Sequence, residues 1–351
     1  MAGLFNSYYY GKAGKADFTV ENLPKNRREL FFQTLRVRFS GIISVNLLFL
    51  VFCLPAIVWT GFNLLAILAA SGLMAETAEG AEAALDASAL QNTAGMLTTY
   101  LLGMVPCLGI AGIGSTGEMY VLRNWARDDH SFMFSDFKDA VKGNWKYGLL
   151  AGLINGLSLL LCYVAYMFYG NMATTNSVFF VIPQMFVVVC VVVWWMINML
   201  IFPMMVTYDM KFGQLVRNCA IMVVARLPWS LLWLAVTALL PFILVMYIPY
   251  GIPIVAVLYL VIGFGLTGFI YASYANACFD RFLNPRIEGA PVNKGIYTDT
   301  DDDDDDEDDI PLPPRPDYSH PPVQRYEDLP KNGENKPEAN SEDQPSGGEG
   351  A

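Results

Sequence analysis

Few side chains in this sequence are of the types that perform acid–base, nucleophilic or metal chemistry. The chain contains two histidines, His130 and His320, and neither belongs to an HExxH zinc motif. Tyr208 and Asp209 end an apolar stretch, but an aspartyl mechanism needs a second aspartate, and the two later apolar stretches contain none. No Walker loop is present either. We therefore expect no catalytic site, no metal site and no cofactor.

Charged groups enclosed in a membrane are costly and usually functional, so their positions bear on transport chemistry. Glu118 and Asp209 lie near the ends of apolar stretches, and Asp280 follows the last one. We expect Glu118 to form an interfacial ion pair with Arg123 or Arg127, which would contribute little free energy. Because no charge lies deeper than these, ion-coupled transport is disfavoured.

The polar residues that lie deep in the apolar stretches are asparagines. Asparagine in a membrane helix is more typical of a hydrogen bond to a neighbouring helix than of an ion site. The four residues concerned are Asn46, Asn155, Asn198 and Asn276. We expect them to hold helices together.

The elements that must position these residues are membrane spans. The chain is 54% hydrophobic, which is too apolar for a soluble globule, and a helix needs about 20 apolar residues to cross the hydrocarbon core. Stretches of that length occur at 41–67, 95–121, 147–169, 178–207, 227–247 and 251–277. The sequence therefore predicts an all-α fold, a polytopic bundle of six transmembrane helices within residues 41–283.

The distribution of lysine and arginine predicts the orientation of this bundle. Segments 1–40, 122–146, 208–226 and 278–294 hold eighteen of these residues, and the three opposite connections hold none. Basic residues are retained on the cytoplasmic side during insertion. We expect a multi-pass protein of the cell membrane with both termini in the cytoplasm.

Small residues predict where two helices approach closely. Gly148, Gly152 and Gly156 form a repeated small-xxx-small series in the third span, which allows a neighbouring backbone to pack against it. Prolines in the spans remove backbone donors and kink helices. Such kinks are typical of simple packing irregularities, and also of discontinuous helices around a transport site.

The segments before the first span and after the second are expected to be structured. Residues 1–40 read as a basic arm followed by an amphipathic interfacial helix, with Asn26 and Glu29 as a variant capping box; the alternative is a continuous extension of the first span. In the loop 122–146, Ser135 is expected to cap a helix that has Asp136 in its first turn. That helix would pack on the bundle or present a groove to a partner.

Residues 284–351 differ from the rest of the chain in composition. They contain a nearly continuous run of acidic residues at 299–309, then a proline-rich stretch. Such a segment cannot bury enough apolar surface to fold, so we expect a disordered acidic cytoplasmic tail. A basic cytoplasmic protein is the partner that this charge predicts, and nucleic acid is not.

Three short stretches resemble the YesL-like family of uncharacterised bacterial integral membrane proteins. They are LPKNR at 23–27, GEMYVLRNWAR at 117–127 and FPMMVTYD at 202–209. The resemblance covers roughly residues 1–285, and the acidic tail departs from the compact form of that family. Some members are encoded near carbohydrate-uptake systems, so the resemblance implies an accessory role in sugar uptake with transporter subunits as partners. It implies no active-site residues.

Two functions therefore remain open. The first is a non-enzymatic membrane protein that assists carbohydrate uptake. The second is a facilitator or transporter for a small neutral solute, which the absence of deep charge does not exclude. The polar or interaction positions on which either function would rest are Glu118, Arg123, Asp136, Asn155 and Asp209.

Overall fold

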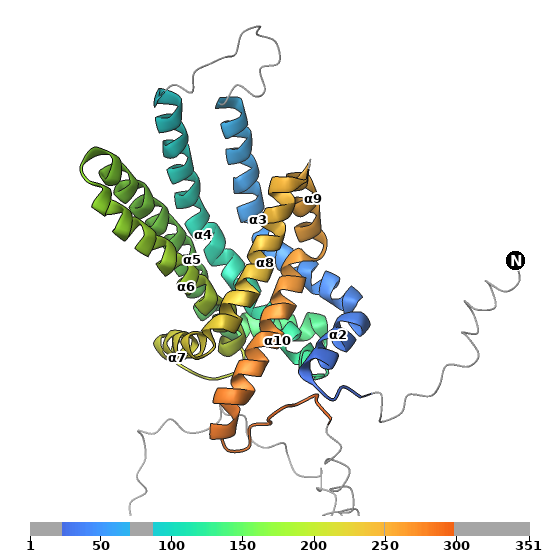
Figure 1. The fold of residues 1–351 in the computed structure, drawn as a ribbon. Coiled ribbons are helices and arrows are strands. Elements are labelled where there is room, and N and C mark those ends of the chain that lie inside the picture. Colours follow the sequence, from blue (N-terminus) through green and yellow to red (C-terminus); the bar gives the residue numbers. More distant parts are fainter. Residues whose placement is uncertain (1–22, 71–86, 249, 298–351) are drawn as a thin grey trace, which may run out of the picture. The chain divides into compact units, whose positions relative to one another are not determined.

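The computed structural model describes residues 23–70, 87–248 and 250–297, and none of these residues forms a strand. Figure 1 shows the arrangement of the helices. In chain order the elements are α2 (Arg27–Val37), α3 (Phe39–Ala70), α4 (Ala87–Trp125), α5 (Met133–Thr175), η2 (Val178–Phe180), α6 (Val181–Met205), α7 (Phe212–Ala225), α8 (Leu227–Tyr247), α9 (Gly251–Leu258), η3 (Tyr259–Gly263), α10 (Phe264–Phe282) and η4 (Asn284–Arg286).

Six helical segments within the described residues are long and apolar enough to cross a membrane. They are Phe39–Ala66, Ala94–Trp125, Met133–Thr175, Val178–Met205, Leu227–Tyr247 and Gly251–Arg286. The predicted all-α bundle of six membrane helices is therefore confirmed. The chain is a multi-pass membrane protein, with apolar surface that suits contact with lipid.

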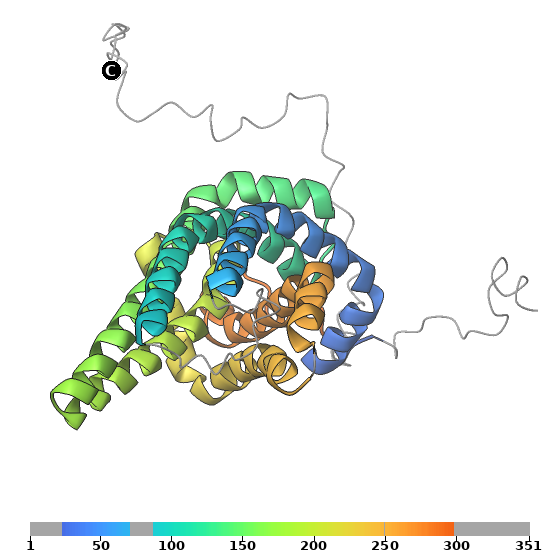
Figure 2. The ribbon, with the colours of Figure 1, turned by 90° about the horizontal axis from the view of Figure 1, so that it is seen from above.

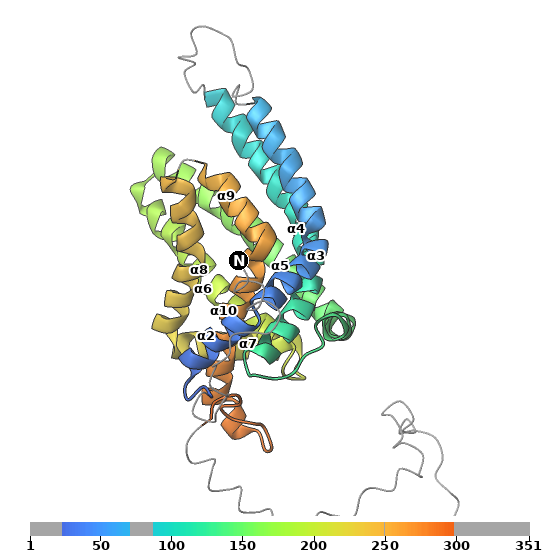
Figure 3. The same ribbon diagram turned by 90° about the vertical axis from the view of Figure 1, so that its right-hand side faces the viewer.

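Successive spans pack against one another, and the last span contacts several of the others. Helices α3 and α4 lie side by side, as do α4 with α5 and α5 with α6 (Figures 2 and 3). Helix α10 contacts α3, α4, α6 and α8. Residues on these four helices that face α10 can therefore share one internal space.

Glycines bring α4 and α5 to backbone contact. A Cβ atom at Gly152 would lie 2.1 Å from the carbonyl oxygen of Leu108, and one at Gly156 would lie 2.6 Å from the Cα of Val105. Gly148 meets Gly112 in the same way, with a Cβ at Gly112 only 2.3 Å from the Gly148 carbonyl oxygen. Since no side chain fits there, dispersion between the two backbones holds this pair of helices together.

The sixth span is interrupted by one π-helical turn, η3, between α9 and α10. Asn46 of α3 is fully buried and donates to the carbonyl oxygens of Tyr259 and Leu260, at 3.3 and 3.0 Å. Its Oδ1 accepts a hydrogen bond from the amide of Gly265 at 2.9 Å. One asparagine thus satisfies backbone groups that the irregular turn leaves free.

The structure corrects the expectation for the loop 122–146. Helix α5 begins at Met133 and runs without a break into the third span, so no separate loop helix ends near residue 146. Ser135 does not cap it: the residue before the helix is Phe132, and Asp136 Oδ2 accepts from the Phe132 amide at 2.9 Å. The acidic residue one position further on is the better acceptor for a free N-terminal amide.

Helix α2 is separate from the first span, as predicted, with the break at Arg38. The Asn26 side chain accepts from the amides of Arg28 and Glu29 at 3.1 and 3.0 Å. Glu29 bonds in return to the amide of Lys25 at 2.9 Å, one residue before the position that a capping box uses.

The first residues assigned to the tail pack on the bundle. Residues 284–297 include η4, and the amide of Tyr297 donates to the Pro24 carbonyl oxygen at 3.0 Å. The boundary predicted at residue 284 is therefore too early for these residues. The acidic run, the first 22 residues and most of the loop at 68–94 lie outside the described residues.

Candidate functional site

A cavity of about 220 Å³ lies among α4, α5, α6 and α10, with Phe49 of α3 at its side. At ~30 Å³ per molecule of liquid water, it has room for roughly seven waters or one small solute. Its polar lining consists of Ser115, Glu118, Asn155, Ser158, Asn198 and Thr267. Its aromatic lining consists of Phe49, Trp194, Trp195, Phe202, Phe264 and Tyr271. Of the described residues, no lysine, arginine or histidine lines this cavity.

Glu118 is the one ionisable carboxyl group among the described residues of this lining. It is 3% exposed, and its Oε1 atom has no hydrogen-bond partner among the described residues. A Cβ atom at Gly268 of α10 would lie 3.2 Å from this oxygen, so the glycine leaves room for the carboxylate. The carboxyl group is thus enclosed by the bundle, in the wall of the cavity.

The predicted ion pair between Glu118 and Arg123 or Arg127 does not form. Helical periodicity gives the reason, because at 3.6 residues per turn a residue five positions further on points about 140° away, and one nine positions further on points to the opposite side. Glu118 therefore faces the cavity, whereas Arg123 faces the end of α6. Glu118 is nevertheless buried between helices, which the sequence analysis did not predict.

Asn198 supplies a second acceptor without a partner. Its amide nitrogen donates to the carbonyl oxygen of Trp194, one turn earlier in α6, at 3.1 Å. Its Oδ1 is buried and has no hydrogen-bond partner among the described residues. Trp194 is held in turn, because its Nε1 donates to Asn155 Oδ1 of α5 at 3.1 Å. The cavity therefore combines fixed aromatic groups with two free acceptor oxygens, Glu118 Oε1 and Asn198 Oδ1.

A second cavity of about 500 Å³ adjoins the first and is lined mainly by apolar groups of α3, α4 and the sixth span. The two share Phe49, Ser115, Asn155, Phe202 and Phe264. Thr60 and Met104 line its far part, on the halves of α3 and α4 that lead to the 71–86 connection. The two cavities thus lie next to each other and share part of their walls.

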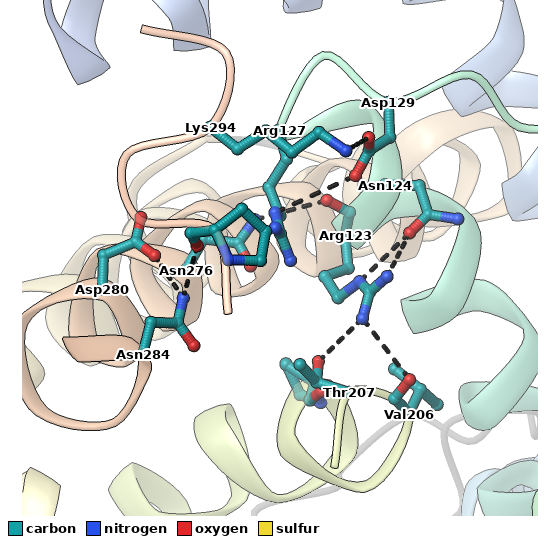
Figure 4. Close-up of polar contacts among 12 residues, drawn as sticks. Arg123, Asn124, Arg127, Asp129, Val206, Thr207, Asn276, Asp280, Asn284 and Lys294 are labelled. Atoms are coloured by element: carbon teal, nitrogen blue, oxygen red, sulfur yellow. Dashed lines mark hydrogen bonds and ion pairs between the residues drawn. The ribbon is translucent and has the colours of Figure 1, made fainter. Parts of the chain in front are cut away.

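Arg123 connects three helices at the opposite end, where basic residues gather (Figure 4). Its Nη1 donates to Thr207 Oγ1 at 3.1 Å, just after α6, and its Nε donates to Asn124 Oδ1 at 3.1 Å. The carbonyl oxygen of Arg123 accepts from Asn276 of α10 at 3.3 Å. Segments 117–127 and 202–209, which are far apart in the sequence, therefore meet at this guanidinium group.

The C-terminal part of the described chain closes this end of the bundle. Lys294 forms an ion pair with Asp129 at 2.5 Å, and Asn284 Nδ2 donates to the carboxylate of Asp280 (Figure 4). Asp280 also pairs with Arg27 of α2. These contacts fix α2, the end of α4 and residues 284–297 against one another.

Tyr208 joins the same group of contacts. Burial, assisted by the negative charge of Asp280, raises the pKa of Tyr208 to about 12, against the opposing effect of Arg127 and Arg123. The hydroxyl group therefore stays protonated at neutral pH and donates to Asn284 Oδ1 at 2.5 Å. Asn284 can then direct its amide nitrogen to Asp280.

The structure thus separates the residues that the sequence singled out. Glu118 and Asn155 line one cavity, and Arg123 lies at the basic end of the bundle. Asp136 is occupied with the start of α5, where its Oδ2 also accepts from Ser131 Oγ at 2.7 Å. Asp209 is exposed beside a shallow hollow and lies apart from the cavity. Gly148, Gly152 and Gly156 lie in the contact between α4 and α5.

The asparagine prediction holds for three of the four residues. Asn46, Asn155 and Asn276 each bond to another helix, whereas Asn198 bonds within its own helix and its oxygen has no partner among the described residues. The aromatic lining was not predicted. A sign of it in the sequence is that Asn198 follows Trp194 by one helical turn, inside a span that is otherwise almost wholly apolar.

The fold and the cavity together define a class: a multi-pass α-helical membrane protein with a mainly apolar cavity among its helices, into whose lining one carboxyl group is built. Residues 42–166 match the family described as "Protein of unknown function, DUF624". The match spans the first two membrane helices and most of the third, including Glu118, Arg123 and Asn155. No curated protein and no solved structure matches the chain.

Proposed function

We propose that this protein is a non-enzymatic membrane protein that binds a small hydrogen-bonding solute in the Glu118 cavity and facilitates its passage. The observation that carries the proposal is the pair of buried oxygens, Glu118 Oε1 and Asn198 Oδ1, that have no partner among the described residues. A buried acceptor without a partner costs about 1–3 kcal/mol. A solute that donates hydrogen bonds to both oxygens would recover that free energy.

The shape of the internal space supports passage as well as binding. The adjoining apolar cavity leads towards the connection between α3 and α4, and the π-helical turn lies beside it through Tyr259 and Leu260. Irregular helical turns often occur at functional sites. We infer that a solute reaches the Glu118 cavity from this end of the bundle, through the larger cavity that adjoins it.

Solute flux into liposomes that contain the purified full chain tests this proposal. Light scattering after mixing with glycerol, urea or a monosaccharide measures the rate of swelling. We expect at least one solute to enter faster than in protein-free liposomes, and Asn198→Ala to change that rate. Asn171→Ala, at an exposed site on α5, is the matched control. Flux equal to that of empty liposomes for every solute, ammonium compounds included, would count against the proposal.

An accessory role in carbohydrate uptake is the alternative, and it rests on the YesL-like resemblance. Co-purification after mild detergent extraction distinguishes the two functions. A stoichiometric transporter partner, together with no flux from the protein alone, would favour the accessory role.

A further inference from the structure

We propose that the solute of the Glu118 cavity is a small organic ammonium ion. This inference rests on the proposed function and names the chemical class of its ligand. It is carried by the composition of the lining, in which one enclosed carboxyl group is surrounded by aromatic rings and amide or hydroxyl groups.

The charge balance of the cavity points to a cation. A carboxylate removed from water needs a counter-charge or a proton. No cationic side chain of the described residues lines the cavity, and none of them forms an ion pair with Glu118. The nearest arginine in sequence, Arg123, is turned away and bonded to Asn124 and Thr207. A bound cation would supply the charge that the protein does not.

The aromatic lining favours an organic cation over a metal ion. Trp194, Trp195 and Tyr271 are part of the lining, and the tryptophan ring is the one that attracts ammonium groups most strongly. Calcium instead takes six to eight oxygen ligands. No group of three or more histidine, cysteine, aspartate or glutamate residues that could hold a metal occurs within the described residues.

The second free oxygen sets a further requirement on the ligand. Asn198 Oδ1 can accept a hydrogen bond, so a ligand that carries an N–H or O–H donor in addition to its charge would bond to this oxygen while its charge offsets that of the Glu118 carboxylate. Ethanolamine and choline are of this type. Each has a neutral counterpart of closely similar shape: ethylene glycol for ethanolamine and 3,3-dimethylbutan-1-ol for choline.

Titration of the purified full chain in detergent with these two pairs tests the inference, with tryptophan fluorescence and calorimetry as the readouts. We expect at least one cation to bind about tenfold more tightly than its neutral counterpart. Glu118→Gln keeps the shape of the side chain and removes its charge, so it should bring the two affinities together. Glu288→Gln, at an exposed acid outside the cavity, should leave the preference unchanged.

Equal affinity for cation and neutral counterpart in the unmodified protein would overturn the inference, and so would a preference that persists in Glu118→Gln. If glycerol or a sugar binds and the binding weakens in Asn198→Ala without any preference for cations, the proposed solute function stands and the ammonium assignment fails. If no solute binds, both fail. If Glu118→Gln does not fold, the comparison of each cation with its neutral counterpart in the unmodified protein still tests the ammonium assignment.

A lipid headgroup is a second source of the same chemistry. Short-chain phosphatidylethanolamine in the titration distinguishes the sources. Binding of free ethanolamine assigns the site to a soluble amine, whereas binding of the lipid alone, lost in Glu118→Gln, assigns it to a headgroup. Binding of neither form, together with no binding of choline, would overturn the assignment.

Discussion

Replacing Gly152 by alanine should destabilise the bundle, whereas the same change at Gly143 should stabilise it. Both glycines lie in α5. The added Cβ at Gly152 would lie 2.1 Å from the Leu108 carbonyl oxygen, about 1.3 Å short of the 3.4 Å at which ordinary van der Waals contact begins. At Gly143 the added atom has nothing within 4 Å. The two variants thus differ in packing and share the change in helix propensity.

The magnitude follows from these distances. Overpacking lowers the free energy of unfolding by about 1–3 kcal/mol. The upper end applies at Gly152, because the obstacle is a backbone carbonyl that cannot rotate away. The higher helix propensity of alanine raises the free energy of unfolding by about 1 kcal/mol. We expect a net loss of about 2 kcal/mol at Gly152 and a gain of about 1 kcal/mol at Gly143. At roughly 2–4 °C per kcal/mol for a domain of this size, the Tm should fall by about 4–8 °C and rise by about 2–4 °C respectively.

Fluorescence-detected gel filtration after heating in mild detergent measures both values. Gly152→Leu should lose more stability than Leu153→Ala, because a bulky side chain must separate the helices whereas Leu153 is only half-buried. A Tm for Gly152→Ala equal to or above that of Gly143→Ala would refute the close packing of α4 on α5.

Three further predictions concern orientation, the C-terminal segment and a buried thiol. Reporter fusions after residues 80 and 177 should report the external side, and fusions after 129 and 210 the cytoplasm, because basic residues flank only the latter pair; a cytoplasmic report at 80 would reverse the orientation. A chain truncated after residue 290 should have a lower Tm than one truncated after residue 297, because only the longer chain keeps the ion pair between Lys294 and Asp129. Equal Tm values would show that residues 291–297 add no stability. Burial raises the pKa of the Cys219 thiol, so less of the reactive thiolate is present at pH 8. A variant whose only cysteine is Cys219 should therefore react with maleimide far more slowly than a variant whose only cysteine is Gly213→Cys, on the same helix. Equal rates would contradict the burial of Cys219.

Much of the fold is predictable from the sequence because a membrane span is a local property. About 20 apolar residues in succession identify a span wherever its partners lie, and the glycine series at 148, 152 and 156 depends only on spacing along one helix. The start of α5 was not predicted because two local candidates competed: Ser135 has the usual capping side chain, but Asp136 carries the charge that a helix N-terminus attracts.

The cavity was harder to predict because it depends on which way side chains point across helices. Glu118 and Arg123 are close in sequence, which suggested an ion pair. Because a helix turns 100° per residue, however, Arg123 lies on another face of α4. Asn198 lines the cavity together with residues of α10, a helix that begins 59 residues after α6 ends. The π-helical turn likewise depends on Asn46, which is 213 residues distant from Tyr259.

The pairing of Arg27 with Asp280 has a consequence for how the protein is made. These residues are 253 positions apart, so at about 5–20 residues per second a ribosome adds Asp280 roughly 13–50 s after Arg27. Phe269, whose ring stacks on that of Phe31 with 5.0 Å between the ring centroids, is synthesised almost as long after its partner. During that interval α2 has neither partner and its aromatic side chains have only the membrane surface or a chaperone to cover them. Helix α2, the first of the described helices to leave the ribosome, is therefore among the last to reach its final place.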